Sequence, residues 1–416
     1  MKKSVLFAIA VASLLLAACG SAQATPQKTT PTRTPTTAPT AAQVKATVAP
    51  ISGGCAPVTL LPSPDPAIPE ISQNDYIRGP QDASITFIVY GDFQCEACAQ
   101  LDGYFKQLLA ANPDVSMVYR YFPEKGHALS LIAAQAAEAA AYQGRFWSMH
   151  DALLANLATW TSMTQDAFIT WVKGEASALG LDPAKFETDM TGPLAVKMVD
   201  EAQSSAIAIG IPSTPYVLIN GIYIGSQVDD ATLNNVLSLT RSMQALEPKT
   251  FKSCPPTVVD NTRQYFAHVS TSKGDFVIQL YPDKAPIAVN SFVFLAQNGW
   301  YDGNPFHRVI PGFVAQTGDP SGTGRGNPGY AYVIETSDLK FDKPGVVGIA
   351  NMGQNTGGSQ FFIAYSAQSS LDGQYTIIGQ VTEGMDVVQK LTPRDPSVAG
   401  TLPDPDTITR VTIEVK

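Results

Sequence analysis

The apolar and polar positions of the chain change their pattern near residue 262, and the N-terminal part combines two kinds of periodicity. The runs ITFIVY (85–90) and VSMVYRYFP (115–123) predict strands, of which the first is apolar enough to be buried. The Ala-rich stretch 129–206 predicts helix throughout, and GIPSTPYVLINGIYIG (210–225) predicts a pair of strands introduced by Thr214-Pro215. With a last helix over 230–243, this order predicts an α/β domain that carries a helical insertion.

The C-terminal part alternates with a period of two over many short segments. YFAHVSTSKGDFVIQLYPDKAP (265–286) predicts a hairpin, and IAVNSFVFLAQNGW (287–300) predicts one amphipathic helix. Further strands are predicted at FHRVI, GFVAQ, GVVGIA, SQFFIAY, YTIIGQV and TRVTIEV, with a helix at MDVVQKL. Many short strands with few helices indicate an all-β closed barrel capped by helices.

The N-terminus predicts export. MKKSVLFAIAVASLLLAAC has a basic start and an apolar run over 5–18, which is shorter than the ~20 residues that a spanning helix needs. Its ending resembles a bacterial lipoprotein signal over residues 1–19, which implies that Cys19 is lipidated and anchors the chain to a membrane. The expected location is the bacterial cell envelope, on the extracytoplasmic side. A cleaved signal without a lipid stays open.

Residues 20–75 are expected to separate the anchor from the folded domains. Residues 20–50 are rich in Thr, Pro and Ala and have no aromatic side chain, so they predict an extended tether. The Pro-rich stretch CAPVTLLPSPDPAIPE (55–70) is expected to wrap the surface of the first domain. The first 64 residues contain five basic residues and no acid, and the whole chain has a net charge of −9, which leaves −14 on the rest. A body this acidic repels phosphate, so nucleic acid is not an expected partner.

Two cysteines three residues apart open the first predicted helix after a strand. At a helix N-terminus, free backbone N–H groups and the helix dipole favour a thiolate, so Cys95 is the expected attacking sulfur. Cys98 lies one turn further along and is placed to resolve a mixed disulfide. The alternative, a structural zinc site, would need a second pair of ligands, which the nearby sequence does not offer. His127 and His150 are expected to have core or surface roles.

The order of strands, CxxC helix and helical insertion resembles DsbA-like thioredoxin-fold proteins over about residues 76–250. The resemblance implies that Pro215 follows a cis bond and faces the redox pair; an ordinary trans proline stays open. Glu96 and Ala97 stand where strongly oxidising relatives carry Pro-His. A carboxylate beside a thiolate raises the thiol pKa, so the direction of exchange stays open among oxidation, isomerisation and reduction.

The remaining cysteines, Cys55 and Cys254, flank the first domain, and both follow the export signal. Pairing them leaves only Cys19 without a partner, which predicts a structural disulfide closed around that domain. Two free thiols are the alternative.

The blocks FHRVIPGFVAQTGDPSGTG, GVVGIANMGQNTGGSQFFIAY and LDGQYTIIGQVTEGMDVVQKL resemble the cyclophilin family of peptidyl-prolyl cis-trans isomerases, over about residues 262–416. The resemblance implies that Arg308 is the catalytic arginine. It further implies a substrate-binding set formed by Phe313, Val314, Gln316, Ala350, Asn351, Gln360, Phe362, Leu371 and Tyr375. Ser370 and Tyr375 depart from the frequent Trp and His of the family, which puts cyclosporin binding in doubt.

Rotation about an X-Pro bond needs no proton transfer and no covalent intermediate, although its barrier is ~18–20 kcal/mol. A donor such as Arg308 can bond the prolyl nitrogen most strongly in the twisted state, inside an apolar cavity that excludes water. A structural salt bridge is the alternative role of this arginine. No cofactor or metal is expected.

Together these features predict a membrane-anchored envelope foldase with isomerase and thiol-disulfide exchange activities. Its expected partners are unfolded or proline-containing exported polypeptides and a redox partner protein. Two alternatives stay open: a holdase that binds peptides without turnover, and a disulfide reductase that uses its second domain for docking.

Overall fold

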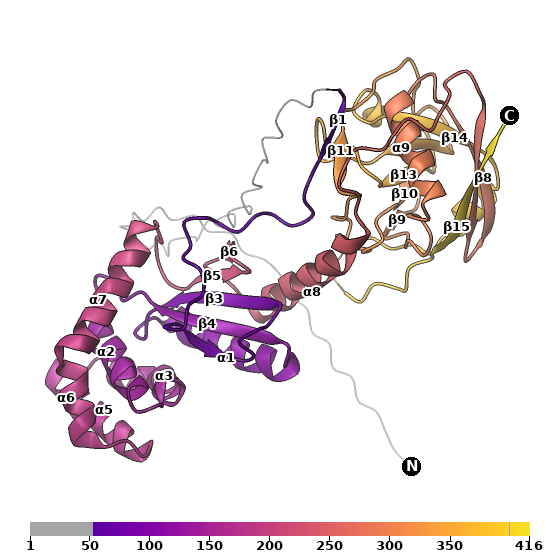
Figure 1. Ribbon diagram of the computed structural model, residues 1–416. Helices are drawn as coiled ribbons and strands as arrows, with labels where there is room; N and C mark the ends of the chain where they lie inside the picture. The colour runs from indigo at the N-terminus through magenta and orange to yellow at the C-terminus, as the bar shows by residue number, and fades with distance from the viewer. Residues whose placement is uncertain (1–52, 399) are drawn as a thin grey trace, which may run out of the picture. The chain divides into compact units, whose positions relative to one another are not determined.

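The computed structural model describes residues 53–398 and 400–416. Its buried apolar residues and the residues packed on them form separate clusters, of which three draw on residues 68–237 and two on residues 246–413 together with Cys55 and Leu60. This division gives two domains, each with its own core (Figure 1). None of the helices in the described residues has the length and apolar character needed to cross a membrane. The predicted signal, Cys19 and most of the tether lie outside the described residues.

The first domain is built on a five-stranded mixed sheet in the order β2-β4-β3-β5-β6. The strands are β2 (Tyr76–Arg78), β3 (Ile85–Gly91), β4 (Val115–Tyr121), β5 (Tyr216–Ile219) and β6 (Ile222–Gly225). Only β3 and β4 run parallel. Phe87 and Val89 of β3 pack with α1 (Glu96–Ala111) and α8 (Asp230–Leu246), whereas Ile88 and Tyr90 pack on the opposite face. Because both faces are covered, the strand is a continuous apolar run.

The Ala-rich block is helical as predicted but is divided into several helices. They are α2 (Ser130–Ala141), α3 (Phe146–Ala155), α4 (Leu157–Trp160), α5 (Gln165–Ala178), α6 (Pro183–Thr191) and α7 (Pro193–Ala208). The side chains of Thr164 and Asp182 cap α5 and α6, and prolines occupy the first turns of α6 and α7. The small alanines of α2 are almost all buried, so neighbouring helices approach it closely. Figure 1 shows these helices gathered at one end of the sheet.

The second domain contains an eight-stranded sheet in the order β15-β7-β8-β14-β12-β13-β10-β9, in which all neighbours are antiparallel. The strands are β7 (Tyr265–Thr271), β8 (Gly274–Leu280), β9 (Arg308–Ile310), β10 (Val314–Thr317), β12 (Val346–Ile349), β13 (Phe361–Ala364), β14 (Ile377–Glu383) and β15 (Ile408–Val415). Helix α9 (Pro286–Gln297) buries Phe292 against Tyr301 and Phe361, and α10 (Met385–Gln389) is short.

The prediction of a closed barrel was wrong in one respect, because no ladder joins the end strands β9 and β15. The sheet is an open half-barrel. In the described residues, the backbone pairing found at its open side consists of two isolated bridges, Pro305–Thr407 and Val309–Arg394. The segment between α10 and β15 contains Pro393, Pro396, Pro403 and Pro405. Proline has no N–H to donate, so this segment does not extend a strand ladder.

The Pro-rich lead-in does not only wrap the first domain, as was expected, because it starts with a strand on the second domain. Strand β1 (Cys55–Pro57) pairs antiparallel with β11 (Tyr330–Tyr332) of the second domain. The predicted disulfide between Cys55 and Cys254 is present, and both cysteines pack against the core of the second domain. The disulfide therefore joins the two segments that flank the first domain, and both segments pack on the second domain.

We expect the double variant Cys55→Ser/Cys254→Ser to lower the unfolding temperature of the second domain and to free β1 for proteolysis. Chain-entropy reasoning sets an upper value of ~5 kcal/mol for the 199-residue separation, and the folded domain inside the loop reduces it. Calorimetry and limited proteolysis of the full chain measure both effects. Cys95→Ser/Cys98→Ser is the matched control, and equal behaviour of the two double variants would contradict the expectation.

Candidate functional site

Three loops of the first domain meet at one edge of its sheet. Residues 92–95 follow β3, and residues 122–129 follow its parallel neighbour β4. Residues 214–215 precede β5, which runs antiparallel to β3, so its beginning lies beside the end of β3. This arrangement brings the redox pair, the end of β4 and Pro215 together, at the edge where open α/β sheets bind ligands.

Cys95 is the N-cap residue of α1, as predicted for an attacking sulfur. The backbone N–H of Cys98 donates to its Sγ at 3.1 Å, and the two cysteines form a disulfide. Both cysteines are buried, with exposed fractions of 7% for Cys95 and 4% for Cys98. In the reduced state, the N–H group and the helix dipole would both stabilise a thiolate at Cys95.

Thr214 brings a carbonyl group to this sulfur. Its oxygen lies 3.8 Å from the Sγ of Cys95, and the bond from Thr214 to Pro215 is cis, as the resemblance implied. In the dithiol state the same oxygen can accept the S–H of Cys95. Pro215 therefore lies beside the redox pair.

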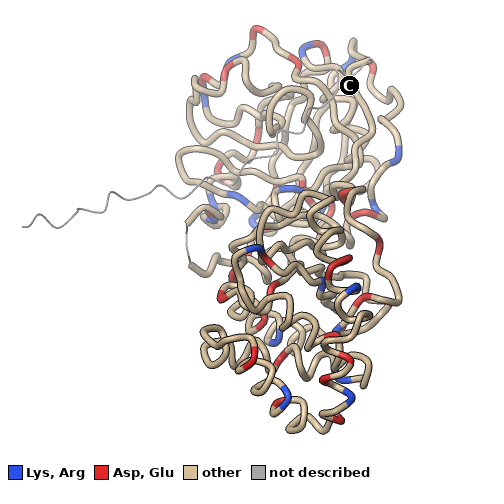
Figure 2. The backbone as a smooth tube through the Cα atoms, turned by 90° about the vertical axis from the view of Figure 1, so that its left-hand side faces the viewer, with Lys and Arg blue, Asp and Glu red and all other residues tan. Residues whose placement is uncertain are grey.

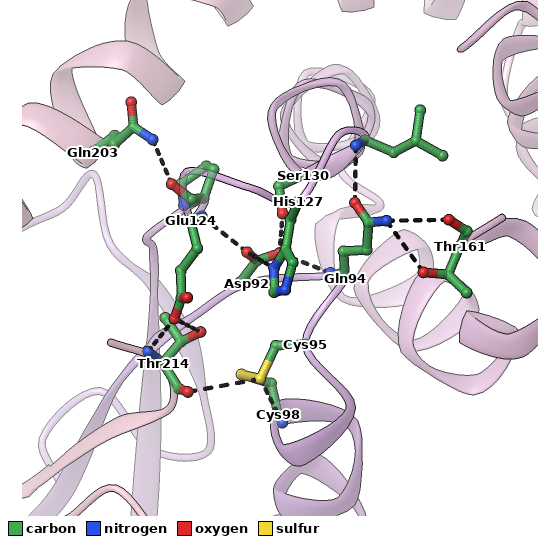
Figure 3. A network of polar contacts seen from close by, with 12 residues as sticks. Asp92, Gln94, Cys95, Cys98, Glu124, His127, Ser130, Thr161, Gln203 and Thr214 are labelled. Atoms are coloured by element: carbon green, nitrogen blue, oxygen red, sulfur yellow. Dashed lines mark hydrogen bonds and ion pairs between the residues drawn. A yellow bond between two sulfur atoms is a disulfide. The ribbon is translucent and has the colours of Figure 1, made fainter. Parts of the chain in front are cut away.

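A buried carboxylate, Asp92, connects the loop that carries Cys95 with the end of β4 (Figure 3). Its exposed fraction is 1%, and it accepts hydrogen bonds from the N–H of Gln94, the N–H of Glu124 and the hydroxyl of Ser130. The Nδ1 atom of His127 lies 2.7 Å from its Oδ2. His127, for which a core or surface role was expected, lies in the loop before α2.

Gln94 and Glu124 extend this network to further loops. The side chain of Gln94 accepts from the N–H of Leu129 and donates to Thr161 after α4. The Oε1 atom of Glu124 accepts from the N–H of Thr214 at 2.5 Å and from its hydroxyl at 2.7 Å. All three loops at the sheet edge are therefore joined by hydrogen bonds.

A second cluster of acidic and basic side chains comes from helices α1 and α3 and from strand β2. Asp102, His150 and Asp151 are close enough to share a metal ion. However, Lys106 lies 2.7 Å from Asp102, and Arg78 lies 2.7 Å from Asp151, so these carboxylates already have cationic partners. Burial lowers the pKa of His150, which favours its neutral form. The cluster is a structural ion network, in agreement with the core role expected for His150.

In the second domain, Arg308 lies on β9 opposite Gln316 of β10. Its guanidinium carbon is 5.4 Å from the centre of the Phe313 ring. Within residues 53–398 and 400–416, its side chain forms no hydrogen bond and no ion pair that would occupy its donors. The structural salt bridge considered above is therefore not seen in the described part of the chain.

Beside Arg308, the apolar side chains of the predicted substrate-binding set belong to one apolar cluster. It contains the predicted residues Phe313, Val314, Ala350, Phe362, Leu371 and Tyr375. Phe362 meets Tyr375 edge to face at 5.3 Å and stacks on Phe341 at 5.5 Å. Phe341 was not predicted as a member of this cluster. It lies in an irregular segment before β12, where no periodicity marks it.

The predicted polar residues form the margin of this cluster. Gln316 donates to Gln360 at 3.0 Å, and Gln360 in turn donates to the carbonyl oxygens of Gly324 and Gly326. Asn351 donates to the carbonyl oxygen of Gln374 and accepts from the N–H of Gly353. The apolar members of the predicted set thus belong to one cluster, Arg308 lies against Phe313 of that cluster, and hydrogen bonds join Gln316 to Gln360 and Asn351 to Gln374.

His307, next to the arginine, was expected to pack, and it is 6% exposed. Burial lowers its pKa, and neither ring nitrogen has a hydrogen-bond partner in the described residues. Asp395 was not predicted as a neighbour of the site. Hydrogen bonds from Ser397, chiefly, and the charge of Arg308 lower the pKa of Asp395.

Comparison with known proteins agrees with this arrangement. The family described as "Cyclophilin type peptidyl-prolyl cis-trans isomerase/CLD" matches residues 266–413. Peptidyl-prolyl cis-trans isomerase-like 1 of Emericella nidulans is 46% identical over 125 residues, which are 29% of this chain and 77% of that protein. The chain belongs to the cyclophilin-type peptidyl-prolyl cis-trans isomerase family.

A bacterial cyclophilin-type relative is similar too. The peptidyl-prolyl cis-trans isomerase of Helicobacter pylori is 43% identical over 129 residues, covering 30% of this chain and 79% of the relative. A cyclophilin type isomerase structure from Cryptosporidium parvum is 32% identical, with a TM-score of 0.34, and covers 36% of this chain and 98% of its own.

The first domain matches a different family, described as "Thioredoxin", over residues 72–238. A thioredoxin-like oxidoreductase structure from Silicibacter pomeroyi is 26% identical, with a TM-score of 0.35, and covers 41% of this chain and 94% of its own. By its two family matches, the chain is a cyclophilin-type protein that also contains a thioredoxin-like domain.

Sequence reasoning missed Asp92, Gln94 and Glu124 in the thioredoxin-like domain. Asp92 immediately follows the buried strand β3, and Glu124 follows β4 by three residues. Polar residues at the ends of adjacent parallel strands lie at the ligand-binding edge of such sheets, and this signal was available in the sequence.

Proposed function

We propose that this protein is an envelope foldase that isomerises X-Pro bonds and exchanges disulfides in exported polypeptides. The observation that carries the proposal is the Arg308 guanidinium, whose donors have no partner in the described residues beside an apolar surface made of cyclophilin-type residues. Both reactions are slow covalent or conformational steps of folding, so one chain that contains a catalyst for each would act on the same clients.

Isomerisation requires an environment that stabilises the twisted amide more than either planar form. The apolar cluster that contains Phe313 and Phe362 would bind the proline ring and exclude water. Gln316, Asn351 and Gln360 would hold the peptide backbone on either side of the proline. Arg308 would then donate to the prolyl nitrogen as it loses conjugation. No group needs to gain or lose a proton.

Thiol-disulfide exchange would proceed through Cys95. Its thiolate attacks one sulfur of a client disulfide, forms a mixed disulfide and releases the other client sulfur as a thiolate. Cys98 then attacks Cys95, releases the second client thiolate and leaves the Cys95–Cys98 disulfide. The client is reduced and the pair oxidised, so a dithiol redox partner must restore the pair; the reverse sequence oxidises a client.

We expect Arg308→Ala to lower kcat/KM for a proline-containing peptide about 10²–10³-fold, because one preorganised donor to the transition state is lost. A coupled peptide-cleavage assay or exchange NMR measures the rate. Arg410→Ala on β15 removes an exposed arginine from the same domain and serves as the control. Full activity of the Arg308→Ala protein would refute the assigned role.

We expect Cys98→Ser to accumulate mixed disulfides with client proteins, because Cys95 can still attack and nothing resolves the adduct. Non-reducing electrophoresis followed by mass spectrometry identifies the adducts. Cys95→Ser/Cys98→Ser keeps the fold and removes the attacking sulfur, so it should trap nothing. If the single variant also formed no adduct under mild oxidation, exchange through Cys95 would be ruled out.

Anchoring at the membrane is proposed from the resemblance of residues 1–19 to a lipoprotein signal. In bacterial cells, we expect the protein to sediment with membranes and Cys19→Ser to move it into the soluble fraction, because the acyl chains supply the binding free energy. Immunoblots of the two fractions measure this, with Cys55→Ser/Cys254→Ser as control. Equal sedimentation of the Cys19→Ser and unmodified proteins would contradict lipid attachment.

A further inference from the structure

Glu124 has no role in the exchange steps above, yet it connects two of the loops around Cys95 (Figure 3). Its N–H donates to Asp92 at 2.9 Å, on the loop that carries Cys95. Its carboxylate accepts both the N–H and the hydroxyl of Thr214. The Thr214 carbonyl oxygen is the group that lies 3.8 Å from the Cys95 sulfur. Glu124 therefore determines where this oxygen lies relative to the sulfur.

Glu124 also differs from the other carboxylates of this region in the partners that its charge has within the described residues. Asp92 is accompanied by His127, and Asp102 is paired with Lys106. The carboxylate of Glu124 accepts only from neutral donors, and in the described residues it forms no ion pair with a cation, although Lys125 follows it in the chain. Its negative charge is therefore not compensated by a bound partner.

This charge is close enough to influence the sulfur. The carboxylate binds the N–H and hydroxyl of the same residue whose carbonyl oxygen contacts Cys95, so the separation is within roughly a Debye length, ~10 Å. The other charged residues in the segments around Cys95 are Glu96 on α1, Asp92 after β3, and Lys125 and His127 before α2. The negative charges of Glu96 and Glu124 both disfavour a thiolate at Cys95, whereas the N-terminus of α1 favours it.

We propose that Glu124 is a positioning residue that holds the Thr214 carbonyl against Cys95 and, by its charge, disfavours the Cys95 thiolate. This inference rests on the proposed thiol-disulfide exchange. A less stable thiolate makes the dithiol form less favoured, and strong oxidants are those whose reduced form is stabilised. Glu124 thus biases the pair towards reduction or isomerisation of client disulfides, with a dithiol partner as the source of electrons.

The charge is tested in the full chain carrying Cys98→Ser, in which Cys95 is a single thiol. Alkylation by iodoacetamide, a neutral probe, is followed against pH by mass spectrometry of the peptide that contains Cys95. Glu124→Gln keeps an oxygen that can accept both hydrogen bonds of Thr214 but removes the charge. We expect its alkylation rate, below the midpoint pH of the parent, to rise about two- to fivefold, and its midpoint pH to fall.

Glu201→Gln, on α7, is the matched control, because it removes an exposed carboxylate that forms an ion pair with Lys197 on the same helix. Its alkylation profile should equal that of the parent. Identical profiles for Glu124→Gln and the parent would overturn the charge effect while leaving exchange itself intact. A parent protein that never exchanges disulfides would instead refute the proposed function together with this inference.

The positioning role is tested with Glu124→Ala, in a chain that keeps both Cys95 and Cys98. This change removes the hydrogen bonds as well as the charge, so we expect disulfide exchange to slow severalfold relative to Glu124→Gln. Circular dichroism establishes whether the Ala variant is folded. Equal exchange rates in folded Ala and Gln variants would overturn the positioning role, and the Gln variant tests the charge whether or not the Ala variant folds.

Discussion

The arrangement of the thioredoxin-like domain depends on the hydrogen bonds of a buried carboxylate. Asp92 is 1% exposed, and an ionised group at such a position is tolerated only when donors surround it. The donors come from its own loop and from the loop after β4, so both loops are fixed by the need to satisfy one group. Because Glu124 belongs to the same segment, this requirement extends to Thr214 and to the position of Pro215.

The two candidate sites use opposite kinds of physical chemistry. At Cys95, polar groups are extensively connected, and reactivity depends on how the surrounding charges balance at one sulfur. At Arg308, an apolar cluster lies on one side and Asp395 is a charged neighbour, and within the described residues no hydrogen bond or ion pair occupies the guanidinium donors. Figure 2 shows basic and acidic positions interspersed along the described backbone.

Much of this organisation could be predicted from the sequence, because it depends on local patterns. The buried run of β3, the CxxC helix and the alternation of β7 identify their elements, and three blocks of residues identify the second domain. Contacts between residues far apart in the sequence could not be predicted in this way. The pairing of β1 with β11 joins residues more than 250 positions apart, and three residues carry too little periodicity to indicate it. The end of β4 marks Glu124 as a residue near the ligand-binding edge, but its hydrogen bonds to Thr214 depend on the fold of a loop and could not be predicted. The closed barrel was predicted from the number of strands, which does not reveal whether the end strands pair.

The pairing of β1 with β11 has a consequence for how the chain is divided. Cys55 and Leu60 pack against the core of the cyclophilin-type domain, and so do Leu246, at the end of α8, and Phe251. This core is therefore discontinuous in sequence, with a small part before the thioredoxin-like domain and the main part after it. In topological terms, the thioredoxin-like domain is an insertion into the cyclophilin-type domain, and a fragment cut at residue 262 would lose side chains that complete the cyclophilin-type core.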